Sequence, residues 1–357
     1  MRHLAPAALH RITTRIFEAV GTPEDIASDV ADVLVDNHLA GHDSHGVLRI
    51  AQYLQWIREG RIVPHARPEV LVDTSSTALV RGHMGFGQSV ALVATDLATA
   101  KAKRNGVAAV SVVDLGHTGR LGAFTERAAR QGVVMFMTVG SGGPAMTVPF
   151  GGAEPSLGTN PIAFSLPRGS QDPVTLDYAT SAIANGKLML ARAKGEPVPE
   201  GSIVDREGAP TTDPEDYFAG GHLLPFGGHK GYALAVIADL LAGPLAGADS
   251  YSGAVMETGV FMFAVASDAF RPERDYLRAM DAVTARITGV PPAPGFDDVL
   301  LPGEPEARTH RARLNDGIPL PEETLAELTQ IAADLGLDID ALDVPLPSGG
   351  GTPTRRQ

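Results

Sequence analysis

One stretch of the sequence predicts the fold class most directly: Val107-Ala-Ala-Val-Ser-Val-Val-Asp-Leu-Gly-His-Thr-Gly-Arg-Leu-Gly122. It begins with a β-branched apolar run typical of a buried strand, passes through three glycines and leads into a helical pattern over 123–130. A strand, a glycine turn and a helix are the parts of an α/β fold. The glycine spacing is not the Rossmann fingerprint, and the next expected strand lacks an acidic residue for a ribose. We therefore expect a non-Rossmann α/β domain.

The same pattern, short apolar runs separated by glycines, extends on both sides of this stretch, from about residue 69 to residue 270. Short apolar runs predict strands at 133–139, 161–166 and 260–265, and longer patterns predict helices at 89–105 and 232–241. Connections of hairpin length and of helix length both occur, which predicts a mixed sheet. Backbone N–H groups at the 116–122 turn, with Arg120 as a counter-charge, would suit a diphosphate.

Both ends of the chain are expected to be helical. Leu9, Ile12 and Ile16 recur at helical spacing, and further helical segments are expected from about 22 and over about 46–60. Beyond residue 270, helices are predicted at 275–288 and 321–335, joined by a Pro-rich stretch at 291–305, and residues 346–357 are predicted to be a disordered tail.

The composition excludes several classes of function. The chain has 357 residues and a formal net charge of −13 at pH 7, so it repels nucleic-acid phosphates. It has no cysteine, which excludes disulfides, thiolate metal sites and cysteine nucleophiles. No apolar run reaches the ~18 residues of a membrane span, because Asp239 interrupts the longest one. We expect a cytoplasmic globular protein that binds no membrane, with residues 1–17 read as a first helix rather than a targeting peptide.

The segment Gly41-His-Asp-Ser-His-Gly-Val-Leu-Arg49 offers the best candidate chemistry. His45 and Arg49 are four residues apart, so on a helix they share one face. Arg49 would hold a carboxylate through its planar fork, and His45 would give a proton to a carbonyl oxygen while Ser44 fixes the ring. An ordinary helix cap with a surface His and Arg is the alternative.

A metal site is a second interpretation of the same region. His38, His42 and His45 fall at i, i+4 and i+7, a spacing that could gather three imidazoles. Gly41 and Gly46 interrupt the helix that this spacing requires. We therefore expect no metal ion.

Two more stretches are candidates for binding. Leu224-Pro-Phe-Gly-Gly-His-Lys-Gly-Tyr232 places Lys230 between glycines ahead of an expected helix, and Gly158-Thr-Asn-Pro161 is a turn ahead of an expected strand. Each could equally be a simple connection, and neither has the order of an NTPase phosphate loop.

Taken together, seven stretches resemble one known family. They occur in this order: Asp43-Ser-His-Gly-Val-Leu-Arg49, Gly158-Thr-Asn-Pro-Ile-Ala163, 177–187, Pro199-Glu-Gly201, Thr211-Thr-Asp-Pro214, Pro225-Phe-Gly-Gly-His-Lys-Gly231 and Leu301-Pro-Gly-Glu304. The chain resembles the malate/L-lactate dehydrogenase family of the non-Rossmann type over about 20–340. That family includes ureidoglycolate and sulfolactate dehydrogenases, diketogulonate reductase and Δ1-piperideine-2-carboxylate reductase.

The resemblance implies a homodimeric oxidoreductase that uses NAD or NADP. It implies one helical domain built from both chain ends, residues 1–68 packing with 305–345, and an α/β domain over 69–304 that binds nicotinamide cofactor and substrate. By position, His45 matches the family's proton donor and Ser44 its relay partner. The residues that match substrate contacts are Arg49, Thr159, Asn185 and Gly186. Those that match the cofactor-binding segments are His117, Thr118, Gly119, Arg120, Leu121, Asp177, Tyr178, Ala179, Gly228, His229, Lys230, Pro302, Gly303 and Glu304. In some members the histidine that matches His117 is the acid/base group, so it is the second choice for that role.

Two departures limit what the resemblance implies about the substrate. Asp114-Leu-Gly-His117 replaces a common Asn-Ser-x-His run, and Asn185 stands where Arg or His is common. The expected reaction is hydride transfer to a small 2-oxo acid or from an L-2-hydroxy acid, with a lean towards the hydroxycarboxylate dehydrogenases. Reduction of a cyclic imine and non-catalytic binding of a nucleotide or metabolite are the alternatives.

Overall fold

A computed structural model describes residues 1–140, 145–248 and 258–338. The chain divides into two compact units, one formed by Met1–Leu54 with the segment from Glu306 onward, the other by Gln55–Pro305. We call them the terminal unit and the sheet unit. The first division falls between residues 54 and 55, inside a helix, whereas the sequence interpretation set it at 68. The tail expected at 346–357 lies outside the described residues.

The terminal unit is helical, with one small sheet made from its two chain segments. Strand β1 (Arg2–Leu4) pairs antiparallel with β12 (Ile318–Leu320). The helices are α1 (Pro6–Ala19), α2 (Glu24–Leu39), the first part of α3 (Ile50–Arg58), most of α10 (Glu304–Asp316) and α11 (Glu322–Asp334). Helix α1 begins with proline at its first position and buries Leu9, Ile12 and Ile16, as their spacing predicted.

Two details of this unit differ from the sequence interpretation. The helix expected over 46–60 begins at Ile50, after two 3₁₀ turns at Asp43–His45 and Val47–Arg49, because Gly46 between them is extended. Helix α10 was not expected, since it has no apolar stripe and none of its residues is buried.

The sheet unit is built on a seven-stranded mixed sheet with the order β2-β3-β4-β11-β5-β6-β7, which confirms the expected fold class. Only β3 and β4 are parallel neighbours; every other pair is antiparallel. The strands are β2 (Glu69–Asp73), β3 (Thr77–Gly85), β4 (Val107–Leu115), β5 (Val133–Gly140), β6 (Ile162–Arg168), β7 (Gln171–Tyr178) and β11 (Thr258–Ala266).

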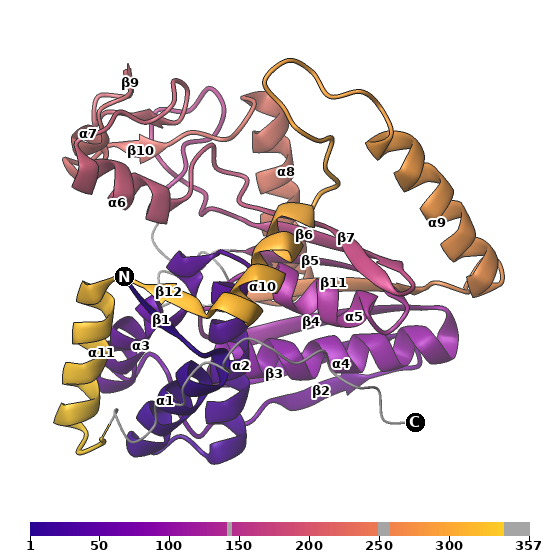
Figure 1. Ribbon diagram of the computed structural model, residues 1–357, viewed down its shortest axis with the longest axis horizontal. Coiled ribbons are helices and arrows are strands. Elements are labelled where there is room, and N and C mark those ends of the chain that lie inside the picture. The colour runs from indigo at the N-terminus through magenta and orange to yellow at the C-terminus, as the bar shows by residue number, and fades with distance from the viewer. Residues whose placement is uncertain (141–144, 249–257, 339–357) are drawn as a thin grey trace. The chain divides into compact units, whose positions relative to one another are not determined.

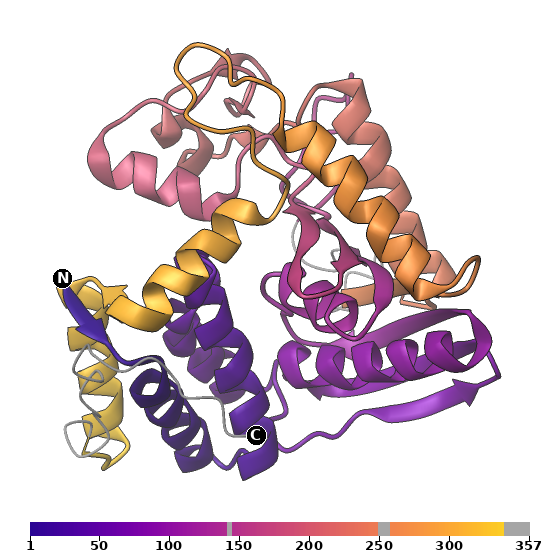
Figure 2. The ribbon, with the colours of Figure 1, turned by 45° about the vertical axis from the view of Figure 1, so that its right-hand side comes forward.

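Helices cover both faces of this sheet. Helix α4 (Gly87–Asn105) packs on β3, β4 and β11, and α5 (Gly122–Ala129) packs beside it on β5, β6 and β7, as Figures 1 and 2 show. Helix α8 (His229–Leu240) lies on the opposite face, where the π turn Leu241–Leu245 that comes after it meets Gly140 and Gly259. Because a Cβ at Gly259 would collide with the carbonyl oxygen of Ala242, only glycine permits this approach.

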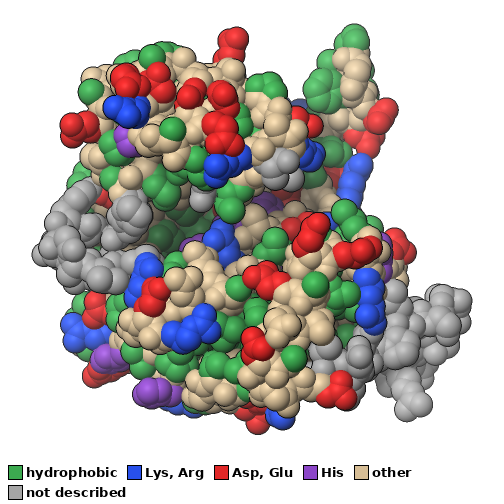
Figure 3. Space-filling view, turned by 90° about the vertical axis from the view of Figure 1, so that its left-hand side faces the viewer, with side chains coloured by type: hydrophobic (Ala, Val, Ile, Leu, Met, Phe, Trp, Pro, Cys, Tyr) green, Lys and Arg blue, Asp and Glu red, His purple; other side chains and the backbone are tan. Residues whose placement is uncertain are grey.

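A small subdomain and one outer helix complete the sheet unit. The subdomain contains α6 (Asn185–Lys194), α7 (Pro214–Phe218) and a three-stranded sheet of β8 (Ile203–Val204), β9 (Pro210–Thr211) and β10 (His222–Leu223). It packs around its own apolar core, which includes Leu188 and Ile203. Acidic side chains gather on its surface in the upper part of Figure 3. Helix α9 (Glu273–Thr288) contacts β6. Among the described residues, no helix has the length and apolar character that crossing a membrane would require.

Candidate active site

The turn over residues 43–47 is held by side chains of the preceding helix. The ring of His38 is fully buried; its Nδ1 lies 2.8 Å from Asp43 Oδ1, and its Nε2 accepts the N–H of Val47 at 3.0 Å. Asn37 Nδ2 donates to the carbonyl oxygen of His45 at 2.9 Å. Both nitrogens of His38 are therefore engaged, and the three-histidine metal site does not form: His42 instead faces Glu306 at 3.6 Å.

Ser44 brings His45 and Arg49 together, although no regular helix joins them. The hydroxyl of Ser44 lies 3.1 Å from His45 Nδ1, and the carbonyl oxygen of the same serine accepts Nε–H of Arg49 at 2.7 Å. Nη1 of Arg49 donates to Gln52 at 2.8 Å, and neither bond uses Nη2. A half-buried imidazole and a half-buried guanidinium thus lie on the two sides of one serine. This arrangement can donate a proton and bind a carboxylate.

Asp43 gives this turn a fixed negative charge. Burial raises the pKa of its carboxyl group, but hydrogen bonds from His38 and Arg313 outweigh that effect and lower the pKa from 3.8 to about 2. Arg313 lies on α10, far away in the sequence, and both its terminal nitrogens donate to the carboxylate.

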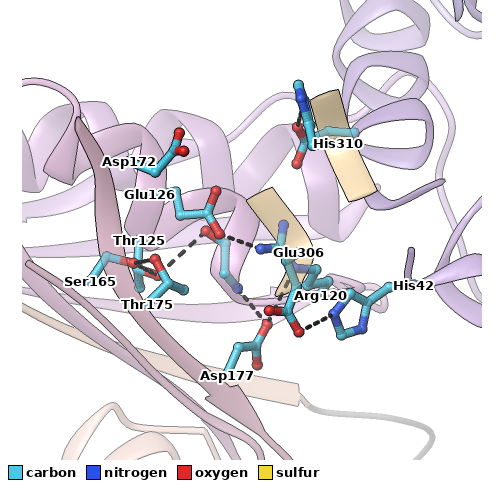
Figure 4. Close-up of polar contacts among 12 residues, drawn as sticks. His42, Arg120, Thr125, Glu126, Ser165, Asp172, Thr175, Asp177, Glu306 and His310 are labelled. Carbon is cyan, nitrogen blue, oxygen red and sulfur yellow. Dashed lines mark hydrogen bonds and ion pairs between the residues drawn. The ribbon is translucent and has the colours of Figure 1, made fainter. Parts of the chain in front are cut away.

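In the sheet unit, a carboxylate of the protein itself occupies the start of α5. Asp177 Oδ2 accepts the N–H of Gly122 at 2.6 Å, and the buried Arg120 contacts both Glu126 and Asp177, as Figure 4 shows. The sequence predicts that backbone N–H groups at this helix start bind a diphosphate, with Arg120 as counter-charge. In the structure, Arg120 instead forms ion pairs with two carboxylates of the protein itself, those of Glu126 and Asp177.

Two predicted cofactor segments meet on strand β7. The N–H of Thr175 donates to the carbonyl oxygen of Pro302 at 3.0 Å, and Gly303, with φ of 84°, packs so closely on Thr175 that a Cβ would not fit. Thr175 also continues a row of buried hydroxyls through Ser165 to Thr125, at 2.9 and 2.8 Å. The segment 302–304 is therefore fixed beside 177–179.

A third set of predicted residues lies around Thr180. Its N–H donates to the carbonyl oxygen of Thr159 at 2.9 Å, its hydroxyl donates to the carbonyl oxygen of Asn160 at 3.1 Å, and its own carbonyl oxygen accepts the N–H of Phe226 at 3.0 Å. Thr159 and the glycine-rich start of α8 are thus brought to the same segment of chain.

The start of α8 has the form of an anion cradle. Gly227 and Gly228 both have positive φ, of 58° and 64°, and within the described part of the chain the N–H groups of Gly228 and His229 have no acceptor. A Cβ at Gly231 would collide with the carbonyl oxygen of Phe226. The ring of His229 lies edge-on to Phe150, with 5.9 Å between ring centres. Such a turn at a helix start favours a bound phosphate.

The remaining predicted residues are placed differently. Thr118, Arg120 and Leu121 are buried, so of the 117–121 loop His117 has the most accessible side chain. Tyr178 is exposed and meets Phe226 edge-on, with 5.3 Å between ring centres. The first turn of α6 contains Asn185 and Gly186, and the side chain of Asn185 lies outside the described part.

Sequence reasoning missed three residues that organise these groups: Asn37, Thr180 and Arg313. Asn37 carried a weak signal, because a polar pair with His38 interrupts an apolar helical pattern. Thr180 lies inside the 177–187 stretch but was not singled out, because its hydroxyl and backbone bind backbone atoms of distant segments, which leaves no signal in the sequence. Arg313 lies in a helix that was not expected.

The comparisons with known proteins agree with this architecture. A family model described as malate/L-lactate dehydrogenase matches residues 4–329. The chain is 36% identical over 344 residues to malate/(S)-sulfolactate dehydrogenase of Methanothermus fervidus, covering 94% of this chain and 99% of that protein. It is 35% identical over 341 residues to hydroxycarboxylate dehydrogenase B of Escherichia coli K12, covering 94% of each.

Solved structures give the same result. Sulfolactate dehydrogenase from Methanocaldococcus jannaschii superposes with a TM-score of 0.88 at 34% identity, covering 95% of this chain and 99% of that one. Δ1-Piperideine-2-carboxylate reductase from Pseudomonas syringae superposes with a TM-score of 0.83 at 31% identity, covering 93% and 100%.

Proposed function

Because the chain belongs to the malate/L-lactate dehydrogenase family, we propose that it transfers a hydride between NAD(P) and the 2-carbon of a small 2-oxo or L-2-hydroxy acid. One observation carries the proposal: Ser44 contacts the ring of His45 through its hydroxyl and the guanidinium of Arg49 through its carbonyl oxygen. A proton donor and a carboxylate-binding group are the two protein groups that reduction of a 2-oxo acid requires.

Each residue then has one task in the reductive direction. Arg49 binds the substrate carboxylate and so orients the neighbouring carbonyl group. When bound, a nicotinamide cofactor would supply the hydride for the carbonyl carbon. His45 gives its proton to the carbonyl oxygen, and Ser44 holds the ring through Nδ1. The product is a 2-hydroxy acid, and His45 recovers a proton from solvent.

The residues of the sheet unit fit a dinucleotide. We expect the N–H groups of Gly228 and His229, with the exposed Lys230, to hold the diphosphate at the start of α8. The start of α5 does not fit that task, since Asp177 already accepts the N–H of Gly122. The 177–179 and 302–304 segments, fixed together on β7, remain candidates for the rest of the nucleotide.

A cyclic imine carboxylate is the second candidate substrate. The piperideine-2-carboxylate reductase structure supports it through its similarity over nearly the whole chain. Arg49 would bind the same carboxylate, and His45 would protonate nitrogen instead of oxygen. The relatives named for sulfolactate, malate and hydroxycarboxylates favour the 2-oxo acid.

The first test is a substrate panel with both nicotinamides. We expect consumption of NADH or NADPH, followed at 340 nm, with at least one 2-oxo acid. The His45→Asn variant should have a kcat lower by about 10²–10⁴-fold. Its nucleotide affinity, measured by fluorescence, should stay within twofold of the wild-type value. His65→Asn, an exposed histidine of the sheet unit, is the control. Arg49→Gln should act mainly on KM for the acid.

Each contrary result has a distinct meaning. Full activity of His45→Asn would remove the histidine from the mechanism. Turnover of a cyclic imine alone would favour the second candidate. Nucleotide binding without turnover on the whole panel would point to a non-catalytic relative.

We further propose that the protein is a cytoplasmic homodimer. The lack of cysteine suits a reducing compartment. Support for the dimer comes from α8, where Leu234, Ile237 and Leu240 recur on one face and are exposed. Exposed apolar side chains that share one helix face favour association with a second copy of the chain.

A further inference from the structure

Arg313 connects α10 to Asp43 of the 43–47 turn and to the end of α2. Its Nη1 donates both to Asp43 Oδ1 and to the carbonyl oxygen of His38, and its Nη2 donates to Asp43 Oδ2 at 3.2 Å. Only 17% of its side chain is exposed. A guanidinium fork that holds both oxygens of one carboxylate fixes the direction of that carboxylate as well as its distance.

Apolar packing does not explain why α10 lies against this turn. None of the helix's residues is buried. The methyl group of Thr309 lies against Gly41, and ion pairs supply further contacts with the region. Glu306 faces His42 at 3.6 Å, and His310 faces Asp36 at 3.5 Å. Figure 4 shows the His42–Glu306 contact. Arg313 is the member of this set that reaches the turn carrying the proposed proton donor.

A short series of contacts leads from Arg313 to His45. Asp43 immediately precedes Ser44, whose hydroxyl faces the ring of His45. The same Asp43 binds His38, whose other nitrogen accepts the N–H of Val47 on the far side of the turn. The turn has little room to relax, because a Cβ at Gly46 would collide with the ring of His38. A displaced Asp43 would therefore displace Ser44 and His45.

We propose that Arg313 is a positioning residue, which sets the place of Ser44 and His45 by holding Asp43 and the carbonyl oxygen of His38. The kinetic measurements that test this proposal rest on the proposed function. Arg313 does not touch substrate in this proposal, so its loss should change catalysis through geometry alone. A misplacement of about 1 Å can lower a rate by about 10²-fold.

The experiment compares Arg313→Met, Arg313→Lys and Arg311→Met. Met keeps an unbranched, shorter apolar side chain and removes the guanidinium donors. Lys keeps the charge without the fork, and Arg311 is an exposed arginine of the same helix. We expect Arg313→Met to lower kcat by about 10–100-fold, with nucleotide affinity within twofold. Arg313→Lys should recover part of kcat, and Arg311→Met should match the wild type.

A second readout does not depend on activity. The imidazole resonances of His45 in histidine-labelled protein, assigned by their loss in His45→Asn, should shift or broaden in Arg313→Met and move back in Arg313→Lys. Unchanged His45 resonances would overturn the proposal, whether or not kcat falls. A kcat equal to that of the wild type would overturn it as well.

Two further outcomes are separable. If Arg313→Met does not fold, the test is made with Arg313→Lys and Asp43→Asn. The two criteria, kcat and the His45 resonances, stay the same. If the wild type turns over no acid or imine, the proposed function fails, and the His45 resonances alone decide whether Arg313 positions the turn.

Discussion

Asp43 shows how a single charge can matter for both stability and catalysis. Burial raises its pKa, but the hydrogen bonds from His38 and Arg313 have the larger combined effect and lower the pKa to about 2. Because the pKa is lower in the folded protein than the ordinary 3.8, the ionised carboxylate stabilises the fold above about pH 4. That contribution is lost as the pH falls from about 4 through 2.

We expect Asp43→Asn to be less stable than the wild type near neutral pH and nearly equal to it at acid pH. The lowered pKa corresponds to about 2.5 kcal/mol before screening. Since 44% of the side chain is exposed, solvent reduces this to about 1 kcal/mol. Urea unfolding of both proteins between pH 2.5 and pH 7 measures the difference. A difference that does not depend on pH would contradict the assignment.

Single residues also show where sequence reasoning reaches its limit. The types and spacing of His45 and Arg49 were enough to pair them. The geometry that pairs them was not foreseeable, because Arg49 binds a backbone carbonyl oxygen that any residue at position 44 would offer. Spacing alone makes His38 a candidate metal ligand, and only its burial and its two partners reveal a structural role.

At the scale of elements, the start of α5 departs most from expectation. Asp177, with 13% of its side chain exposed, binds the N–H of Gly122 and faces Arg120 at 3.9 Å. A carboxylate at a helix start is favourable in the same way as a bound phosphate. A glycine turn before a helix therefore predicts that some anion is bound at the helix start. The sequence does not indicate that this anion is the carboxylate of Asp177, 55 residues later in the chain.

We expect Asp177→Ala to lower the free energy of unfolding by roughly 1–3 kcal/mol, because it leaves a buried N–H group without its acceptor. Asp177→Asn should lose less, since its amide oxygen can still accept that N–H. Asp172→Ala, on the same strand and 42% exposed, is the control and should stay within about 0.5 kcal/mol of the wild type. Denaturant unfolding measures all three, and an equal loss in Asp177→Ala and Asp172→Ala would contradict the role.

Helices with an apolar pattern were predicted close to their observed positions, whereas a helix without such a pattern was missed. The expected ranges of α4 and α9 begin about two residues from the observed ones. The first helix, expected over 1–17, begins only at Pro6, because Arg2–Leu4 forms strand β1 with β12. Helix α10 has no such pattern, and no helix was expected between the Pro-rich stretch and residue 321. A helix held by charges leaves no hydrophobic period in the sequence.

For the whole molecule, the patterns predicted a mixed α/β sheet but not the order of its strands. Apolar runs show that a strand is buried, whereas its neighbours depend on pairings between distant segments. The position of β11 between β4 and β5 illustrates this, because no property of its sequence identifies those two partners.

The proposed dimer is tested on α8. A charge at position 237, introduced by Ile237→Asp, should dissociate the dimer, because the side chain is 55% exposed and lies between Leu234 and Leu240 on one face. Val93→Asp on α4, at 40% exposure and on the other side of the sheet, is the control and should remain dimeric. Sedimentation velocity measures the mass. A wild-type monomer, or a dimeric Ile237→Asp, would contradict this surface.

The central place of β11 has a consequence for how the protein is made. Strand β5 ends at Gly140, and β11 does not begin until Thr258. At about 5–20 residues per second, a ribosome needs on the order of ten seconds to supply the missing strand. Throughout that time the nascent chain carries β4 and β5 with open hydrogen-bonding edges, which are prone to aggregation. Newly synthesised chains should therefore depend on chaperones until the middle of the sheet emerges.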